Sequence, residues 1–214
     1  MKQILLILLV LGLIRPLAHA SEDNFLTDDE KKDGWMLLFN GKDLTGWKVD
    51  KWNPGGFSIE ENAIKCHGKP SMLYYDGEGK EMKNFHFVAD VKTLPGANSG
   101  VFFHTAYKDK GWPRGHEAQV NQTHLDPVKT GSIYIVAKNL EKVAENKKWF
   151  KYEIIVEGQK ITTKVDGKTI IEYTEEKGLT KPRKLSSGTI ALQAHDPGSK
   201  VYYKNIKVKA LPDS

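Results

Sequence analysis

Short runs of apolar and aromatic residues alternate with clusters of glycine, asparagine and aspartate along most of the chain. Within several runs, such as residues 85–92, 115–121 and 188–195, apolar and polar residues also alternate one by one. Successive side chains of a β-strand point to opposite faces, so this pattern predicts strands with one buried face. The runs recur about every eight to twelve residues, which is typical of sandwiches and barrels. The sequence therefore predicts one all-β domain over residues 34–211.

The segment before residue 34 does not share this pattern. Lys2 precedes an apolar run at residues 4–14, and the small residues Ala18 and Ala20 follow it, which is the arrangement of a signal peptide cleaved after Ala20. The run is shorter than the roughly twenty apolar residues of a membrane-spanning helix. We therefore expect a periplasmic or secreted chain with no membrane association after cleavage. Residues 21–33 are charged and poor in apolar groups, and we expect them to form a flexible arm.

Composition narrows the classes of function. The chain has 32 basic and 27 acidic side chains, a net charge of +5, and its lysines are scattered rather than gathered in runs. Nucleic-acid-binding proteins carry basic clusters, so we expect no nucleic-acid partner. Cys66 is the one cysteine of the sequence. No disulfide can form within the chain, and stability has to come from the apolar core.

The polar faces of the predicted strands carry an unusual mixture of side chains. A face that is only solvated is rich in lysine, glutamate and threonine, as at residues 160–164, and simple solvation is the alternative explanation of the alternation. Here the polar positions carry imidazole, amide, carboxylate and phenol groups, which suit the hydroxyls and ring faces of a sugar. The candidate residues are Asp90 and Lys92 in 85–92, His104 in 99–107, Glu117 and Gln119 in 115–121, Tyr134 in 132–136, and Gln193 and His195 in 188–195.

Five strings, in order along the chain, resemble one family that is common among exported bacterial proteins. They are LLFNGKDLTGW at 37–47, PGANSGVF at 95–102, GHEAQV at 115–120, GTIALQAH at 188–195 and YKNIKV at 203–208. In these strings the chain is similar to the 3-keto-disaccharide hydrolase domain. The resemblance implies a concanavalin-A-like jelly-roll β-sandwich of two antiparallel sheets. It also implies a substrate groove on the concave sheet and activity on glycosides whose sugar carries a ketone at carbon 3.

A ketone at carbon 3 changes the chemistry of glycosidic cleavage. It acidifies the hydrogen on carbon 2, so a base can remove that proton, the enolate can expel the aglycone from carbon 1, and water can then add. By the resemblance, Glu117 is the expected base or acid, and His104 and His195 are expected proton carriers or electrophiles. Gln119 and Gln193 are expected to hold hydroxyls, Tyr134 and Trp112 to contact the sugar ring, and Asp90 and Lys92 to complete the floor.

Two positions depart from the family pattern. His104 stands where many members carry arginine, and Asp90 stands where glutamate is usual, so the sugar or linkage accepted here can differ. No close ligand spacing such as H-E-x-x-H is present, and no cofactor is predicted, although a divalent cation that holds the enolate stays open. The keto-sugar would come from a sugar 3-oxidoreductase, which we expect as a functional partner.

Two other functions fit the same fold. A lectin-like carbohydrate-binding module would keep the ring contacts but would need no acid or base with a shifted pKa. An ordinary retaining glycosidase needs two carboxylates about 5 Å apart, and Gln119 stands where a second strand-borne carboxylate would be most useful. The pKa of Glu117 therefore separates an enzyme from a binding module.

Overall fold

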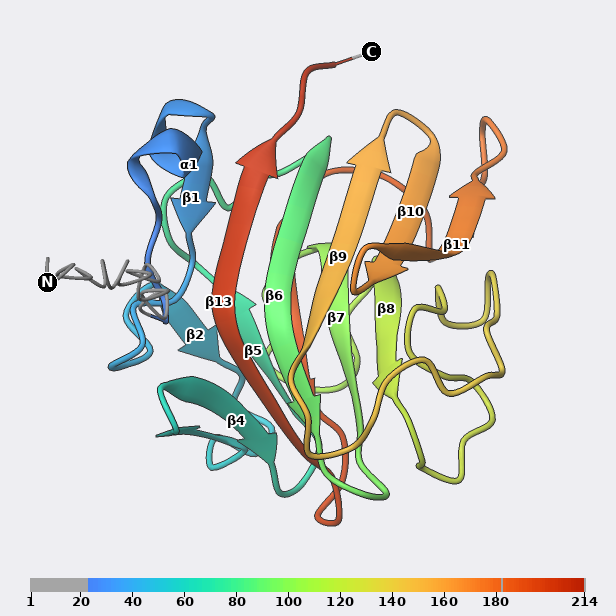
Figure 1. Cartoon of the computed structure of the whole chain (residues 1–214). Coiled ribbons are helices and arrows are strands. Elements are labelled where there is room, and N and C mark those ends of the chain that lie inside the picture. Colours follow the sequence, from blue (N-terminus) through green and yellow to red (C-terminus); the bar gives the residue numbers. More distant parts are fainter. Residues whose placement is uncertain (1–22, 182, 214) are drawn as a thin grey trace, which may run out of the picture.

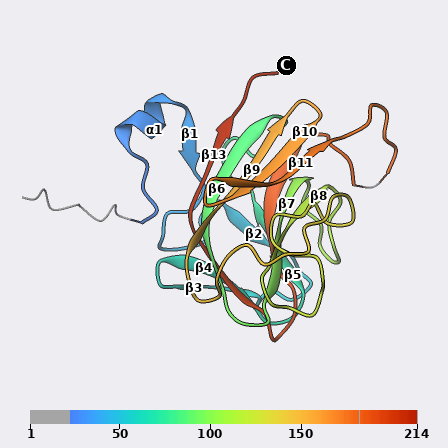
Figure 2. The same ribbon diagram turned by 45° about the vertical axis from the view of Figure 1, so that its right-hand side comes forward.

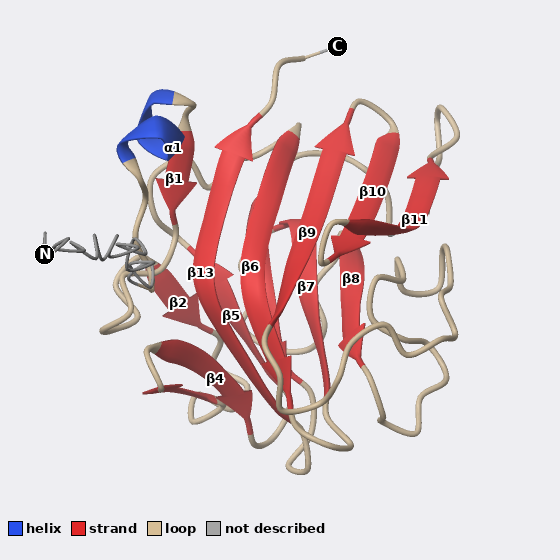
Figure 3. Cartoon of the chain, viewed as in Figure 1, coloured by secondary structure: helices blue, strands red, loops and turns tan. Residues whose placement is uncertain are grey.

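Two antiparallel β-sheets pack face to face in the computed structural model, which describes residues 23–181 and 183–213 (Figure 1). Strands dominate this part of the chain, and α1 (Asp28–Lys32) is its one α-helix (Figure 3). The five-stranded sheet has the order β2 (Trp47–Val49), β5 (Ser71–Tyr75), β12 (Thr189–Ala194), β7 (Asn98–Thr105) and β8 (His116–Asn121). The eight-stranded sheet has the order β11 (Lys168–Thr174), β10 (Lys160–Val165), β9 (Phe150–Glu157), β6 (Phe85–Thr93), β13 (Lys200–Ala210), β4 (Ala63–His67) and β3 (Phe57–Glu60), and β1 (Trp35–Leu37) pairs with β13. The prediction of an all-β sandwich is confirmed.

The core lies between the two sheets and follows the predicted alternation. Leu192 and Val101 of the five-stranded sheet and Phe87 of the eight-stranded sheet are fully buried in one apolar cluster. A polar link crosses this core, because the Tyr203 hydroxyl lies 2.8 Å from Ser99 Oγ, which donates to the backbone carbonyl of Gln193 at 2.6 Å. The outer face of the five-stranded sheet is therefore fixed from behind by the opposite sheet.

The segment before β1 differs from the prediction of a flexible arm. The helix α1 begins with a capping box between Thr27 and Glu30, and it lies beside β1 at one end of the sandwich (Figure 2). Lys207 of β13 pairs with Glu30, and Lys209 lies 2.6 Å from Asp33. The prediction is wrong for residues 23–33, because their acidic side chains pair with lysines of the sheet. The predicted signal peptide lies outside the described residues.

The described residues contain no helix that is long and apolar enough to cross a membrane.

Asp90 and Lys92 do not lie on the five-stranded sheet, which carries the other strand-borne residues of the predicted site. Both belong to β6 of the eight-stranded sheet, and their side chains point away from its buried face. Asp90 accepts a hydrogen bond from Asn205 at 2.6 Å, and Lys92 pairs with Glu61. Their predicted role in the floor is wrong, because alternation tells which face of a strand is polar but not which sheet the strand joins.

His104 is turned out of the predicted face by a β-bulge. Across the β7–β12 pair, Phe102 is opposite Ala191 and Thr105 is opposite Thr189, so two residues of β7 share one position of β12. The bulged residue His104 has φ 51°. Its Nε2 donates to the Lys83 carbonyl at 2.8 Å, and its Nδ1 accepts from the Ser186 amide at 3.0 Å. The prediction that His104 meets the substrate is therefore wrong, since both ring nitrogens serve the fold.

We expect His104→Phe to lower the free energy of unfolding by about 2 kcal/mol, because it leaves the Lys83 carbonyl and the Ser186 amide without their partner.

Burial lowers the pKa of His104 to about 4. Unfolding therefore takes up a proton below the unfolded pKa of roughly 6.5, and wild-type stability should fall from there toward pH 4. Urea unfolding at several pH values measures both effects. The control His67→Phe, which loses one half-buried bond to Ser58, should cost less than about 1 kcal/mol; equal losses would contradict the structural role.

Candidate functional site

A polar pocket opens on the outer face of the five-stranded sheet. Side chains of β7, β8 and β12 form its floor. Its walls come from His195, the residue that follows β12, and from three loops. Six of the nine predicted site residues line it, namely Glu117, Gln119, Gln193, His195, Tyr134 and Trp112, together with Asn98, Asp126 and Arg183, which the sequence analysis missed. His104, Asp90 and Lys92 do not line it.

Glu117 lies on the pocket floor with little access to water. Its residue is 5% exposed, and burial raises the pKa of its carboxyl to about 7 against the opposing effect of Arg183. The neighbouring strand leaves space for the carboxyl only because residue 100 is glycine. A Cβ on Gly100 would lie 2.6 Å from Glu117 Oε1. A carboxyl with this pKa can donate or accept a proton near neutral pH.

Arg183 reaches the floor from the loop between β11 and β12. Its Nη2 lies 3.3 Å from Glu117 Oε2, and its guanidinium lies 5.5 Å from the ring centres of both Phe102 and Tyr134. No motif or periodic pattern surrounds position 183, so nothing in the sequence marks a residue that only the path of the loop brings to the sheet.

Two buried histidines hold this loop at its ends. His116 Nε2 lies 2.9 Å from Glu175 Oε2, and the same carboxylate accepts from the Leu185 amide. The Ser186 amide donates to His104. The loop therefore closes between two fixed points, and Arg183 lies between them.

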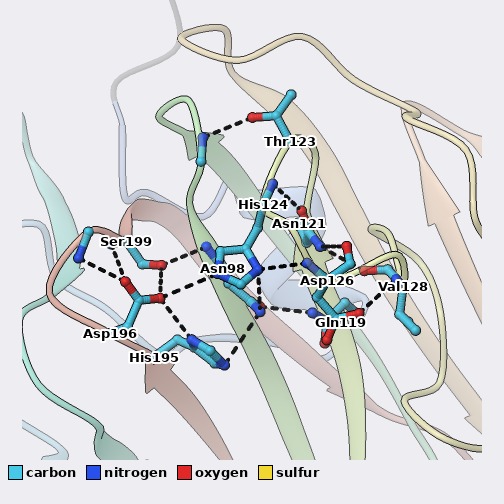
Figure 4. A network of polar contacts seen from close by, with 12 residues as sticks. Asn98, Gln119, Asn121, Thr123, His124, Asp126, Val128, His195, Asp196 and Ser199 are labelled. Carbon is cyan, nitrogen blue, oxygen red and sulfur yellow. Dashed lines mark hydrogen bonds and ion pairs between the residues drawn. The ribbon is translucent and has the colours of Figure 1, made fainter.

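His195 is oriented by the residue that follows it. Its Nδ1 lies 2.8 Å from Asp196 Oδ2, and Ser199 Oγ donates to the same carboxylate oxygen at 2.5 Å (Figure 4). Asp196 keeps a pKa below its usual value although burial opposes this, because Ser199 and His195 donate hydrogen bonds to it. With Nδ1 carrying the proton, the lone pair of His195 lies on Nε2, 3.4 Å from the side-chain amide of Asn98.

Asn121 at the end of β8 builds the loop that brings Asp126 and His124 to the pocket. Its side-chain amide donates to the carbonyls of Asp126 and Val128 at 2.9 and 2.8 Å, and its oxygen accepts from the His124 amide (Figure 4). The backbone pairing of β8 ends at Asn121, and the hydrogen bonds of this one side chain hold the loop that follows. Asp126 is a second carboxylate beside Glu117, and its loop position hid it from strand-by-strand sorting.

Two aromatic side chains form walls of the pocket. Trp112 stacks on the imidazole of His195, with ring centres 6.0 Å apart and planes at 18°, and Trp52 packs against it edge-on. Tyr134 lies on a tight turn rather than on the predicted strand at 132–136, because the Val136 and Ala137 amides both donate to the Ile133 carbonyl.

Three residues that line the pocket each carry a buried polar atom with no hydrogen-bond partner among the described residues. They are Gln119 Oε1, Gln193 Oε1 and Arg183 Nη1. Unpaired buried polar atoms are costly. Two acceptors and one donor on residues that line one small space favour a ligand rich in hydroxyl groups.

The cluster of His124, His195 and Asp196 offers ligand atoms that lie within 4.8 Å of one another. The Asp126 amide donates to His124 Nδ1 at 3.1 Å, so the proton of that ring lies on Nε2, the nitrogen that faces Asp196. His195 Nδ1 is held by Asp196. Both ring protons face the Asp196 carboxylate, so a divalent cation bound at this cluster would have to displace them.

Comparisons with known proteins agree with this architecture. A candidate glycosyl hydrolase from Parabacteroides distasonis, known from a crystal structure, superposes with a TM-score of 0.74 at 25% identity, covering 89% of this chain and all of the other. The exoplasmic domain of VIP36 in its Ca²⁺- and Man3GlcNAc-bound form has a TM-score of 0.59 at 12% identity, over 86% of this chain and 91% of that one. At that identity the likeness concerns the fold alone, and it confirms the lectin-like jelly roll.

Sequence comparison identifies the family. The 3-keto-disaccharide hydrolase of Bacteroides thetaiotaomicron is 26% identical over 235 aligned positions, which cover 84% of this chain and 79% of the relative. The sequence profile of the 3-keto-alpha-glucoside-1,2-lyase-like domain matches residues 34–209, which include every residue of the polar pocket. The chain therefore belongs to the family of 3-keto-alpha-glucoside-1,2-lyase-like domains.

Proposed function

We propose that this chain cleaves glycosides that carry a ketone at carbon 3, by eliminating the aglycone and then adding water. The observation that carries the proposal is Glu117, a buried carboxyl with a pKa of about 7 on the floor of a hydroxyl-binding pocket. Family membership and the name of the Bacteroides relative support the same substrate class. A pure binding module would gain nothing from a carboxyl held at this pKa.

The pocket would hold the keto-sugar by its polar floor and aromatic walls. Gln119 and Gln193 offer unpaired side-chain oxygens to sugar hydroxyls. Trp112 and Tyr134 stand at the walls, where their rings can contact the apolar face of a pyranose. The sugar would lie with carbon 2 toward one end of the pocket and carbon 1 toward the other. Different groups of the protein then remove the proton from carbon 2 and give a proton to the leaving group at carbon 1.

His195 is the proposed base for the first step. Asp196 accepts the Nδ1 proton, so Nε2 presents its lone pair to the pocket. Nε2 takes the proton from carbon 2, and the electron pair moves onto the ketone oxygen at carbon 3 to form an enolate. The side-chain amide of Gln193 on the floor can donate to that oxygen.

Glu117 is the proposed acid for the second step. The enolate reforms the ketone and breaks the bond between carbon 1 and the aglycone oxygen, which takes the proton of Glu117. Water then adds to carbon 1 and gives a proton back to the Glu117 carboxylate, while protonated His195 returns its proton to carbon 2. The sum is hydrolysis to a 3-keto-sugar and an alcohol, with both residues restored.

Two further expectations belong to the same proposal. A sugar 3-oxidoreductase would supply the ketone, since the reaction described here needs it already formed. The signal peptide predicted at residues 1–20 would place this reaction in the periplasm or outside the cell. Neither expectation is needed for the chemistry in the pocket.

We expect Glu117→Gln to lower kcat for methyl 3-keto-α-glucoside at least about 100-fold, because the amide cannot protonate the departing oxygen. In the wild type, kcat/KM should fall as pH rises above about 7, since the acid loses its proton there. The variant should lack that decline. Alcohol release followed from pH 5 to 9 measures both, and unchanged turnover by the variant would remove Glu117 from the mechanism.

We expect Asp196→Asn to lower kcat about 10- to 100-fold with little change in KM, because the amide no longer fixes the proton on Nδ1 of His195. The matched control is Asp109→Asn, whose carboxylate pairs with Lys51 at the surface and should leave both quantities unchanged. An unchanged kcat in Asp196→Asn would assign the base to another group.

A second candidate is an ordinary glycosidase, favoured by one observation, the presence of Asp126 beside Glu117 in the pocket. Such an enzyme would use the two carboxylates and would need no ketone. We expect turnover of 3-keto-trehalose and none of trehalose, with Asp126→Asn retaining most of the wild-type rate. Cleavage of trehalose that Asp126→Asn abolishes would favour the glycosidase instead.

A further inference from the structure

A larger and more apolar groove adjoins the polar pocket. It lies between the 133–137 turn and the segment around the end of β11, and it encloses about 1070 Å³ against about 360 Å³ for the pocket. Ile135, Val136, Tyr173 and Leu179 form its walls, with exposed Thr174, Glu176 and Lys181 at the rim and Arg183 at the inner end. The groove thus has an apolar wall and a polar margin, unlike the pocket.

Two features place the groove next to the pocket. Arg183 lines both spaces. Tyr134 lines the pocket and the next residue, Ile135, lines the groove, so one tight turn supplies a side chain to each. The ion pair between Arg183 and Glu117 therefore stands at the junction of the two spaces.

Ile135 is held in the groove at a cost to the backbone. Its φ is 60°, a left-handed conformation that β-branched residues rarely adopt. Its side chain is 63% exposed although it is apolar. Asparagine or glycine would adopt this backbone conformation at a lower energetic cost. An isoleucine at this position would contribute to binding if a ligand covers its side chain.

We propose that this groove binds the leaving group, and that the preferred substrates are 3-keto-glycosides of apolar alcohols. The inference rests on the proposed function, in which the aglycone oxygen departs beside Glu117. An atom bonded to that oxygen lies at the junction with Arg183, and the rest of the aglycone extends along Ile135, Val136 and Leu179. An alkyl or aryl chain removes these side chains from water, whereas a second sugar would press hydroxyls against them.

The test compares octyl with methyl 3-keto-α-glucoside, below the concentration at which the octyl compound forms micelles. The two leaving alcohols are of similar acidity, so a difference in kcat/KM reports binding of the aglycone. We expect the octyl compound to be preferred about tenfold or more. Ile135→Asn, which keeps a residue suited to the left-handed turn, should reduce kcat/KM about fivefold for the octyl compound and leave the methyl compound unchanged.

The control is Leu140→Asn, another exposed apolar side chain, 62% exposed, that lines neither space. It should leave both substrates unaffected. Equal rates for octyl and methyl substrates, or an equal effect of Ile135→Asn on both, would overturn the inference while turnover itself upholds the proposed function.

Binding separates the two proposals if no keto-glycoside reacts. That result would reject the proposed function, and titration of the Glu117→Gln variant with octyl and methyl glucoside would then judge the groove alone. Tighter octyl binding that Ile135→Asn weakens supports an apolar ligand in the groove. Equal affinities reject it.

Discussion

A carboxyl group buried on the face of a sheet has to be matched by a partner, and the pairing of Glu117 with Arg183 meets that constraint. Burial alone raises the pKa of a carboxyl, and a nearby cation lowers it. At 3.3 Å from one guanidinium nitrogen the cation offsets part of the effect of burial, and burial remains clearly the larger. The acid strength of the pocket therefore depends on where one loop delivers one arginine.

The loop is placed by residues that never touch the pocket. His116 and Glu175 join its first half to β8, and His104 at the bulge of β7 binds its second half. Burial lowers the pKa of both histidines, so both rings are neutral and act as neutral hydrogen-bonding groups. Because of the bulge, the His104 side chain leaves the polar face of the sheet and instead binds the loop that carries Arg183.

Alternation of polar and apolar residues was enough to predict the sandwich and the strand-borne part of the pocket. Glu117, Gln119 and Gln193 came from that rule, because each lies on a regular strand whose other face is apolar. The rule failed at His104, where a bulge reverses the order, and at Asp90 and Lys92, whose strand joins the other sheet. It could not find Asp126 or Arg183, since loops have no period and their paths depend on contacts such as Asn121 with Val128 and, across a longer separation, His116 with Glu175.

Cys66 is the single thiol of the sequence and lies fully buried on β4. Burial raises its pKa and keeps it protonated, which makes it a poor nucleophile. A cysteine introduced at the groove rim would therefore be the one thiol that reacts readily with a fluorescent or spin label. The chain is suited, without replacement of its native cysteine, to observing the arginine-bearing loop when a sugar is added.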